Sequence, residues 1–233
     1  MPVISDSLIS MCKIPDCGVF CYGDWPPSGK TLIITNDKLI MQLPTGRPCC
    51  NTKALMYKNS IYVFGGYKNR IEESEFASEF NLLTSNWKVL TSMPKPSTGV
   101  YSLPYDEEIL LLGCNHDKLY SYNIQKNSYR EVTAMVKGKR RVLFGIGKLV
   151  YVIESEGNIL KSEGNLIEWS IIGSGSAFQP QISYIELYNE SFYFMDQTCL
   201  LYQFKLSEER LRIVDLIEKE GENASTEFHY LTL

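Results

Sequence analysis

The chain has little histidine and no excess of positive charge. It contains two histidines, and its 23 basic and 27 acidic residues give a formal charge of −4. A basic face supplies most of the affinity of proteins for nucleic acid, so the composition predicts no nucleic-acid partner. Two histidines also leave few options for acid–base catalysis, and no Ser/His/Asp or Cys/His constellation is visible in the sequence.

Long apolar runs are also missing. No stretch approaches the roughly 20 apolar residues that cross a bilayer. The first residues, MPVISDSLISMCK, lack the basic and apolar regions of a secretory signal. The seven cysteines are odd in number in a chain of this size, which favours reduced thiols. The sequence therefore predicts a cytoplasmic protein with no membrane partner.

What the chain does contain is a repeat. Short apolar strand candidates, each preceded by a turn, have their centres at Phe20, Tyr62, Leu110, Tyr151 and Tyr193, at spacings of 42, 48, 41 and 42 residues. A second series runs in the same register and consists of Trp87, Tyr129, Trp169 and Leu211, at spacings of 42, 40 and 42. A period in the forties with four short strands per unit is typical of propeller blades. We expect the anchor side chains to pack between neighbouring sheets.

The second unit resembles the kelch repeat. It carries Ile61-Tyr62-Val63-Phe64-Gly65-Gly66, followed by Glu79-Phe80-Asn81, Trp87 and Met93-Pro94. The other units are degenerate: the third keeps Gly113, the fourth keeps Trp169, and the fifth has Asp196-Gln197 in place of the glycines. The resemblance covers about residues 10 to 215. It implies an all-β fold, a kelch-like β-propeller of five four-stranded blades with six as the alternative, and structural roles for Gly65, Gly66, Trp87, Tyr129 and Trp169.

We expect one propeller over residues 1–233, with blades at approximately 8–46, 47–95, 96–135, 136–177 and 178–215. In the first blade, strands b, c and d are predicted at 19–23, 31–35 and 39–43. Residues 216–233 form a tail, whose alternating EFHYLTL could pair with the first blade and close the ring, since closure removes exposed edges. A truncated ring, or one completed by self-association, is the alternative.

The stretch VFCYGDWPPSGKTLIIT, residues 19–35, looks like a phosphate-binding loop. However, Gly23 and Gly29 are separated by five residues instead of four. Pro26 and Pro27 lack the backbone donors that would bind phosphate, and the strand-like LIIT stands where a helix should begin. We interpret the stretch as strand b, the b–c loop and strand c of the first blade.

Antiparallel strands place the b–c loops and the d–a connections at the same end of a propeller. The b–c loops are predicted at 24–30, 67–75, 115–118, 154–158 and 196–198, and YKNRIEESE at 67–75 is the longest. Loops on a rigid scaffold commonly carry recognition. The expected partner-binding residues are Trp25, Tyr67, Lys68, Asn69, Arg70, Asn115 and His116. The alternative is a set of solvated loops without a partner.

Three residues suggest an axial metal site. Glu154 and Asp196 occupy the same repeat position in neighbouring blades, and His116 lies three residues beyond it in the third blade. Two carboxylates and an imidazole suit a divalent ion, whereas the alternative is that each acid caps its own turn. The cysteines lack the C-x2-C spacing of zinc sites and are expected in the core. The basic run at 137–141, KGKRR, is expected to be a solvated d–a connection.

The expected function is protein–protein interaction through the b–c loop face, as a scaffold or substrate-recognition module without catalysis or a cofactor. The kelch resemblance implies a protein partner, and an adaptor role would need a separate adaptor subunit. The alternative is a small-molecule or sugar-processing enzyme with an axial, metal-dependent pocket formed by Glu154, Asp196 and His116. Removal of residues 67–75 is expected to leave thermal unfolding nearly unchanged. Trp87→Ala or Trp169→Ala should destabilise the fold by about 3–5 kcal/mol.

Overall fold

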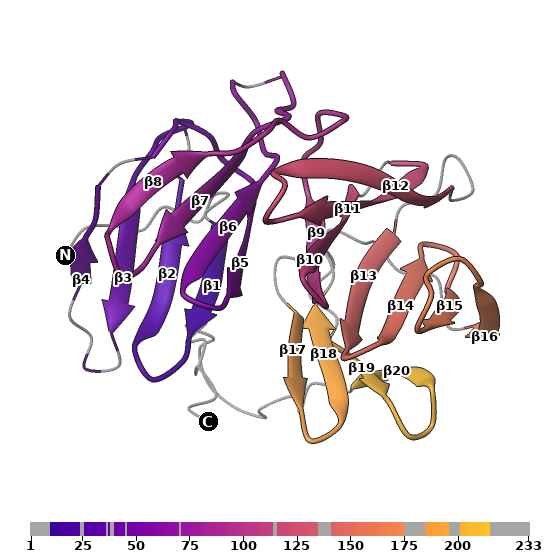
Figure 1. The fold of residues 1–233 in the computed structure, drawn as a ribbon. Helices are drawn as coiled ribbons and strands as arrows, with labels where there is room; N and C mark the ends of the chain where they lie inside the picture. The colour runs from indigo at the N-terminus through magenta and orange to yellow at the C-terminus, as the bar shows by residue number, and fades with distance from the viewer. Residues whose placement is uncertain are drawn as a thin grey trace.

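The computed structural model describes residues 10–23, 26–35, 37, 40–44, 46–69, 71–113, 116–134, 141–174, 185–195 and 201–214. These residues form twenty β-strands in five antiparallel sheets of four strands each (Figure 1). None of them is helical, so this part of the chain holds no helix that could span a membrane. The predicted all-β propeller of five four-stranded blades is confirmed.

The strands follow the chain from blade to blade. Blade 1 consists of β1 (Ser10–Ile14), β2 (Gly18–Tyr22), β3 (Thr31–Thr35) and β4 (Ile40–Gln42). Blade 2 consists of β5 (Lys53–Tyr57), β6 (Ser60–Phe64), β7 (Ala77–Asn81) and β8 (Asn86–Val89). Blade 3 consists of β9 (Val100–Tyr105), β10 (Glu108–Gly113), β11 (Lys118–Asn123) and β12 (Ser128–Ala134). Blade 4 consists of β13 (Arg141–Ile146), β14 (Leu149–Glu154), β15 (Asn158–Glu163) and β16 (Ser170–Ser174), and blade 5 of β17 (Ile185–Tyr188), β18 (Ser191–Met195), β19 (Leu201–Lys205) and β20 (Arg210–Val214).

Each blade is built from consecutive strands in the order a, b, c, d. The first strands of blades 1 to 4 lie next to one another, because β1 contacts β5, β5 contacts β9 and β9 contacts β13. In Figure 1 the sheets succeed one another from indigo blade 1 to the orange and yellow blade 5. The segment 216–233, which was expected to close the ring, lies outside the described residues.

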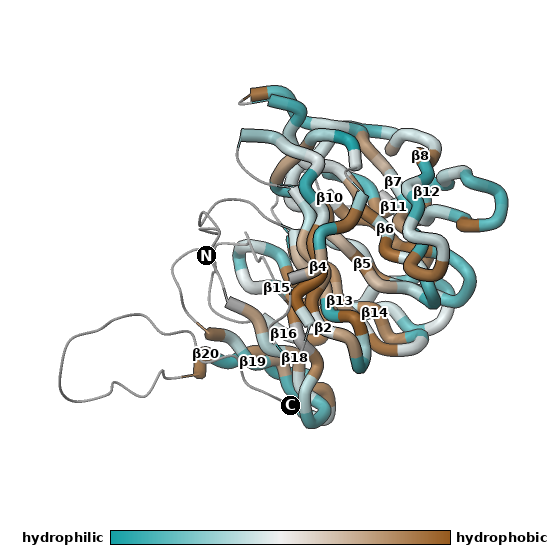
Figure 2. Tube along the Cα trace, turned by 90° about the vertical axis from the view of Figure 1, so that its left-hand side faces the viewer, coloured by the Kyte–Doolittle hydropathy of each residue, from teal (hydrophilic) through white to brown (hydrophobic). Residues whose placement is uncertain are grey.

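Hydrophobic side chains lie on both faces of the inner sheets, so blades 2, 3 and 4 each pack against the blade before and the blade after. In β6, Ile61 and Val63 join the apolar cluster shared with blade 1, whereas Tyr62 and Phe64 join the cluster shared with blade 3. A third cluster unites blades 3, 4 and 5. Figure 2 shows hydrophobic colouring along many strands and mostly hydrophilic colouring on the outlying loops. The core is therefore a series of layers between sheets.

The segment that resembles a phosphate-binding loop leads into β3, a strand, as predicted. Its Gly29 lies against the connection after β4: the Gly46 N–H donates to the Gly29 carbonyl at 2.9 Å. A Cβ atom on Gly29 would come within 2.0 Å of the Gly46 oxygen. The glycine is therefore needed for close packing of two loop backbones, which accounts for it without any bound phosphate.

Two of the three predicted aromatic anchors tie a blade to the one before it. The indole N–H of Trp87 donates to the Pro44 carbonyl at 2.9 Å, and the Tyr129 hydroxyl donates to the Thr91 carbonyl at 3.0 Å. Each acceptor lies in the connection that follows the outer strand of the preceding blade. Trp169 differs, because its indole N–H donates to Leu166 of its own blade at 3.0 Å. All three anchors pack against an apolar cluster between blades, and the hydrogen bond to the preceding blade is found at two of them.

Candidate functional site

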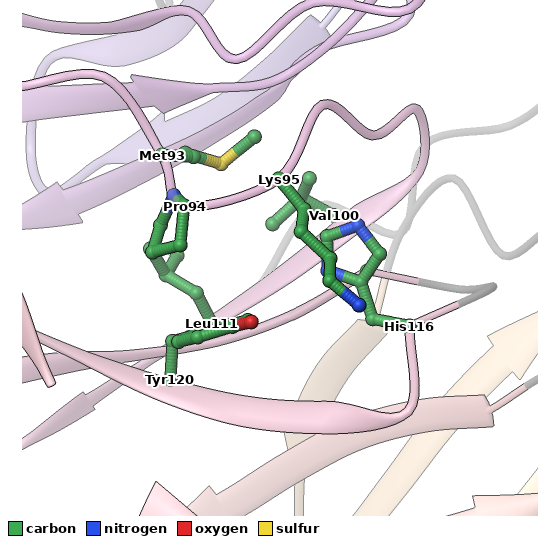
Figure 3. Close-up of a pocket in the computed structure, with 8 residues that line it drawn as sticks. Met93, Pro94, Lys95, Val100, Leu111, His116 and Tyr120 are labelled. Atoms are coloured by element: carbon green, nitrogen blue, oxygen red, sulfur yellow. The ribbon is translucent and has the colours of Figure 1, made fainter. Parts of the chain in front are cut away.

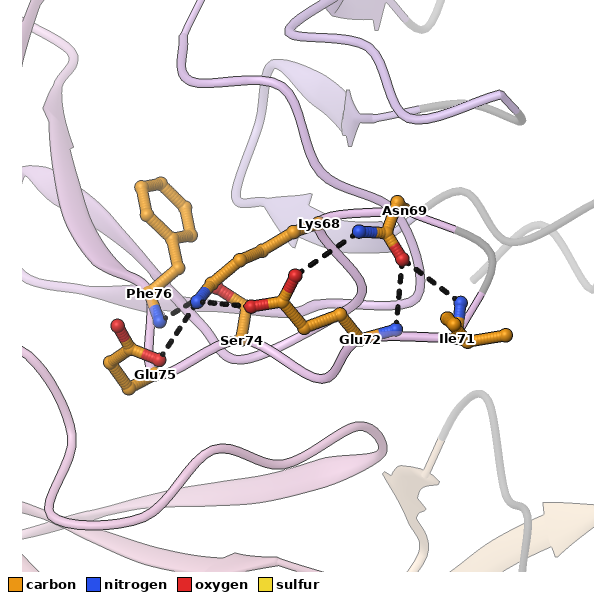
Figure 4. Close-up of polar contacts among 7 residues, drawn as sticks. All are labelled: Lys68, Asn69, Ile71, Glu72, Ser74, Glu75 and Phe76. Carbon is orange, nitrogen blue, oxygen red and sulfur yellow. Dashed lines mark hydrogen bonds and ion pairs between the residues drawn. The ribbon is translucent and has the colours of Figure 1, made fainter.

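The long b–c loop of blade 2 is ordered by its own side chains (Figure 4). The Asn69 side-chain oxygen accepts hydrogen bonds from the N–H groups of Ile71 at 3.1 Å and Glu72 at 3.0 Å. The Asn69 amide donates in turn to the Glu72 carboxylate at 3.1 Å. Lys68 forms ion pairs with Glu72 at 3.1 Å and Glu75 at 3.3 Å. These contacts support the backbone of the loop on both sides of residue 70.

Ile71 is the most exposed large hydrophobic side chain among the described residues, at 90% exposure. It follows the Asn69 turn at the tip of the loop (Figure 4). The hydrogen bond from its N–H fixes the backbone that presents this side chain. The neighbouring Arg70, predicted as a binding residue, lies outside the described residues. Exposed apolar residues are common one at a time, but here the supporting backbone is fixed as well.

The two ends of this loop are bonded to the connections that precede and follow blade 2. The Tyr67 N–H donates to Cys50 at 2.8 Å, and the Met93 N–H donates to Glu75 at 2.8 Å. Gly65 and Gly66, the predicted repeat glycines, have φ of +70° and +100°. Cβ atoms on them would lie 2.4 Å and 2.5 Å from backbone oxygens of neighbouring segments. Removal of all of residues 67–75 would break these contacts, so the expectation of a neutral deletion does not agree with the structure.

His116 lies at the same end of the propeller, in the loop after β10. Its Nε2 atom is 3.1 Å from the Pro96 carbonyl, and the adjacent Lys95 and Asp117 form an ion pair at 3.0 Å. Between these loops is a cavity of about 10 Å³, lined by Met93, Pro94, Leu111, His116 and Tyr120 among others (Figure 3). A cavity of this size holds at most about one water molecule. It therefore offers no room for a substrate.

Arg141 and Glu154 form a buried ion pair at the b–c end of blade 4. Their side chains are 1% and 6% exposed, and Arg141 Nε lies 3.3 Å from the carboxylate. Arg141 also donates to the His116 carbonyl at 3.1 Å, and Asn158 donates to Glu154 at 3.2 Å. Burial lowers the pKa of Arg141, and the Glu154 carboxylate opposes this effect. The expectation of a solvated basic run is wrong at Arg141, because β13 and β14 place a carboxylate directly opposite it.

The predicted metal site is not assembled among the residues that the structure describes. The Glu154 carboxylate accepts from Arg141, whereas the His116 ring contacts the Pro96 carbonyl and only the main-chain carbonyl of His116 accepts from Arg141. No group of three or more His, Cys, Asp or Glu residues in the described part could hold a metal ion. The third predicted ligand, Asp196, lies outside it. The Glu154 carboxylate therefore neutralises Arg141 and helps to join blades 3 and 4.

The cysteines of blades 1 and 2 behave as core residues. Cys12, Cys21, Cys49 and Cys50 are buried. Burial raises the pKa of Cys12 and Cys49 to about 12 and that of Cys21 to about 11. A thiol with such a pKa stays protonated at neutral pH and is a weak nucleophile.

Three polar contacts join the loops of blades 2, 3 and 4 at one end. They are Glu73 to Thr98 at 3.1 Å, Pro96 to His116 at 3.1 Å, and His116 to Arg141 at 3.1 Å. Of the predicted partner-binding residues, Tyr67, Lys68, Asn69 and His116 lie on this surface. Trp25, Arg70 and Asn115 lie outside the described residues. The sequence prediction missed Ile71, although an asparagine two residues earlier is a recognisable turn signal.

These features define a class: a β-propeller with a kelch-type repeat and an ordered loop face. The similar proteins include Kelch-like protein 23 of Homo sapiens, which is 28% identical over 138 residues, covering 53% of this chain and 24% of the relative. Those of Pongo abelii and Mus musculus are 28% and 27% identical over the same lengths. The chain thus spans about a quarter of the length of these relatives.

The solved structure titled "Structure of YjhT" matches with a TM-score of 0.65 at 12% identity, covering 84% of this chain and 74% of that one. This likeness shows the fold alone. No protein-family model matches the chain. The five four-stranded blades and the similarity to the Kelch-like relatives support the kelch-repeat resemblance that the sequence indicated.

Proposed function

We propose that this protein binds a partner protein through the b–c loop face of blades 2 to 4, with Ile71 as the apolar anchor of the contact. The Kelch-like relatives and the propeller fold fit a protein-interaction module. The observation that carries the finer proposal is the ordered loop at 67–75, which presents an isoleucine side chain that is 90% exposed.

The energetics favour such an anchor. Full burial of an isoleucine side chain contributes roughly 1.5–3 kcal/mol. Binding normally costs free energy to order loops at the interface, and a loop that is already fixed avoids much of this cost. Asn69 and Lys68 fix this one through their contacts with Glu72. The same charged side chains would form a polar rim around the isoleucine, as at many protein interfaces.

Blade 2 offers a matched control at its opposite end. Leu83, in the turn between β7 and β8, is 76% exposed. The side chain of Asn81 accepts from the Leu83 N–H at 3.1 Å and the Thr84 N–H at 2.9 Å. This repeats the relation of Asn69 to Ile71. The two sites have the same local chemistry and differ in the face on which they lie.

The test compares the full chain with Ile71→Ala and Leu83→Ala variants as baits in a native extract. Retained proteins are identified by mass spectrometry, and the affinity of the one that Ile71→Ala loses is then measured by calorimetry. We expect Ile71→Ala to weaken that complex by about tenfold or more and Leu83→Ala to leave it unchanged. A partner lost equally with both variants, or with neither, would contradict the assignment of the b–c face.

We further propose that the protein acts in the cytoplasm as a recognition subunit without catalysis of its own, and that it joins other machinery through a separate adaptor. Imaging of a fluorescent fusion tests the compartment. Mass spectrometry of intact complexes tests whether an adaptor subunit is bound together with the partner. Exclusion of the fusion from the cytoplasm would overturn the first part, and a stoichiometric partner complex without any adaptor would overturn the second.

A further inference from the structure

The outermost strands of the five blades differ in how well their edges are protected. Among the residues that the structure describes, each of them pairs with a neighbouring strand on one side only. Exposed edges attract other chains, and proteins commonly guard them with charged residues. Charged residues occur in β8, β12 and β20, namely Lys88, Arg130 and Glu131, and Arg210 and Arg212. β4 spans only three residues.

β16 in blade 4 is neither charged nor as short as β4. Its sequence, SIIGS, contains no charge and no proline. Ile171 within it is 69% exposed, and Ile167 just before it is 75% exposed. A shift in register leaves Ile172 as an extra residue opposite β15. This bulge limits any added strand to a short length, about five residues, but it places no charge on the edge.

An open hollow of about 250 Å³ lies at the start of this strand, lined by Lys161, Glu163, Glu168, Trp169 and Ser170. The Lys161 ammonium is held by the carboxylates of Glu163 and of Glu209 in blade 5. The carboxylate of Glu168 has no ion pair among the described residues. Two carboxylates and one ammonium line the hollow and leave it net negative. Together with the half-buried Trp169 ring, these charges favour a cationic side chain.

We propose that β16 is a docking edge for an extended segment of a partner protein, with a lysine or arginine of that segment in the hollow beside Trp169 and Glu168. The segment would add a strand to blade 4 through main-chain hydrogen bonds, a recurring mode of peptide recognition. An apolar side chain of the segment would cover Ile171. This surface is the outer rim of blade 4, so it is a second interaction surface and does not depend on Ile71.

The first test uses fluorescein-labelled synthetic peptides of about seven residues and the full chain, with binding followed by fluorescence anisotropy. The peptides alternate valine and threonine and carry either arginine or glutamate at one end. A third peptide has the arginine and N-methylated backbone amides on alternate residues. We expect the arginine peptide to bind with a Kd below about 1 mM, the glutamate peptide to bind at least about threefold more weakly, and N-methylation to abolish binding.

Each opposite result overturns part of the proposal. No binding of the arginine peptide at about 1 mM, or equal binding of the N-methylated peptide, would overturn strand addition. Equal binding of the glutamate peptide would overturn the assignment of the hollow.

A matched pair of variants locates the site. Ile171→Lys places a charge on the β16 edge, and Val89→Lys places one on β8 at a residue of nearly equal exposure, 69% against 68%. Ile171→Lys should weaken binding by about tenfold, and Val89→Lys should leave it unchanged. Glu168→Lys should remove the preference for arginine over glutamate. All three side chains are exposed, and thermal unfolding checks that the variants fold. Equal effects of the two strand variants would overturn the choice of β16.

Discussion

Trp87 and Trp169 occupy the same position in the repeat of blades 2 and 4, yet they lie in different surroundings. Trp87 packs with the rings of Tyr22 and Phe80, at centroid distances of 4.9 Å and 5.2 Å, and bonds to the preceding blade. Trp169 bonds to its own turn and has no aromatic neighbour among the described residues. The repeat therefore fixes the position of the residue within its blade, whereas the contacts of its side chain depend on the neighbouring blade.

The largest expected effect comes from truncating the first of these tryptophans. Trp87→Ala removes a ring from the layer between blades 1 and 2 and leaves a cavity, so the free energy of unfolding should fall by about 3–5 kcal/mol. Trp169→Ala should cost about half as much, because its ring borders an open hollow. Chemical denaturation of the two variants checks the comparison. Equal decreases in the free energy of unfolding would show that both tryptophans contribute equally to the stability of the core.

The hydrogen bond that links an anchor residue to the preceding blade can be tested separately at Tyr129. Tyr129→Phe keeps the ring but removes the hydroxyl that donates to Thr91. We expect a loss of about 1 kcal/mol in the free energy of unfolding. Tyr188→Phe serves as the control, since Tyr188 is 43% exposed. If the control loses as much stability, the bond to Thr91 is not the cause.

Blade 4 is bonded to blade 3 through Arg141 and is also linked to blade 5, by the ion pair of Lys161 with Glu209. Hydrogen bonds to Glu163 and Glu209 raise the pKa of Lys161 above its ordinary value of 10.5. The stabilisation is therefore complete below about pH 10.5 and is lost as the pH rises through the folded-state pKa. Lys161→Met should cost about 1 kcal/mol or less at pH 7.

The pH dependence gives this prediction its test. Urea unfolding of the wild type and Lys161→Met at neutral and strongly alkaline pH should show two stabilities that converge as the pH rises. A constant difference at every pH would mean that the lysine acts through packing and not through its charge.

The regular part of the fold could be predicted from the sequence because the repeat carries its own register. The predicted strand at 31–35 is β3, where β-branched residues dominate. The predicted strand at 39–43 corresponds to β4 at 40–42, which ends one residue earlier than predicted, while Leu39 lies outside the described residues. An outer strand is hydrogen-bonded to one neighbouring strand, so the residue at which it ends depends on that single neighbour. Local pattern is therefore sufficient for the inner strands and less so for the outer ones.

The candidate site was harder to predict, since its contacts join different blades. The basic run at 137–141 suggested a solvated loop, yet Arg141 pairs across a hairpin with Glu154. The turn at Gly147 and Lys148 sets that register, so the pairing of the two residues was available from the sequence. The hydrogen bond from Arg141 to the His116 carbonyl could not be predicted from the sequence, because it depends on how blade 3 lies against blade 4.

The continuity of each sheet has a consequence for how the molecule can be divided. Since every blade uses four consecutive strands, a break between β12 and β13 separates no strand from its sheet. Within the described part of the chain, the two fragments would share side-chain packing and loop contacts, such as that between Arg141 and His116, and no strand pairing. If a fragment with blades 1 to 3 binds a fragment with blades 4 and 5, the dissociation constant of that complex reports the free energy of packing between blades 3 and 4. The strength of this contact between blades could then be measured as an ordinary bimolecular affinity.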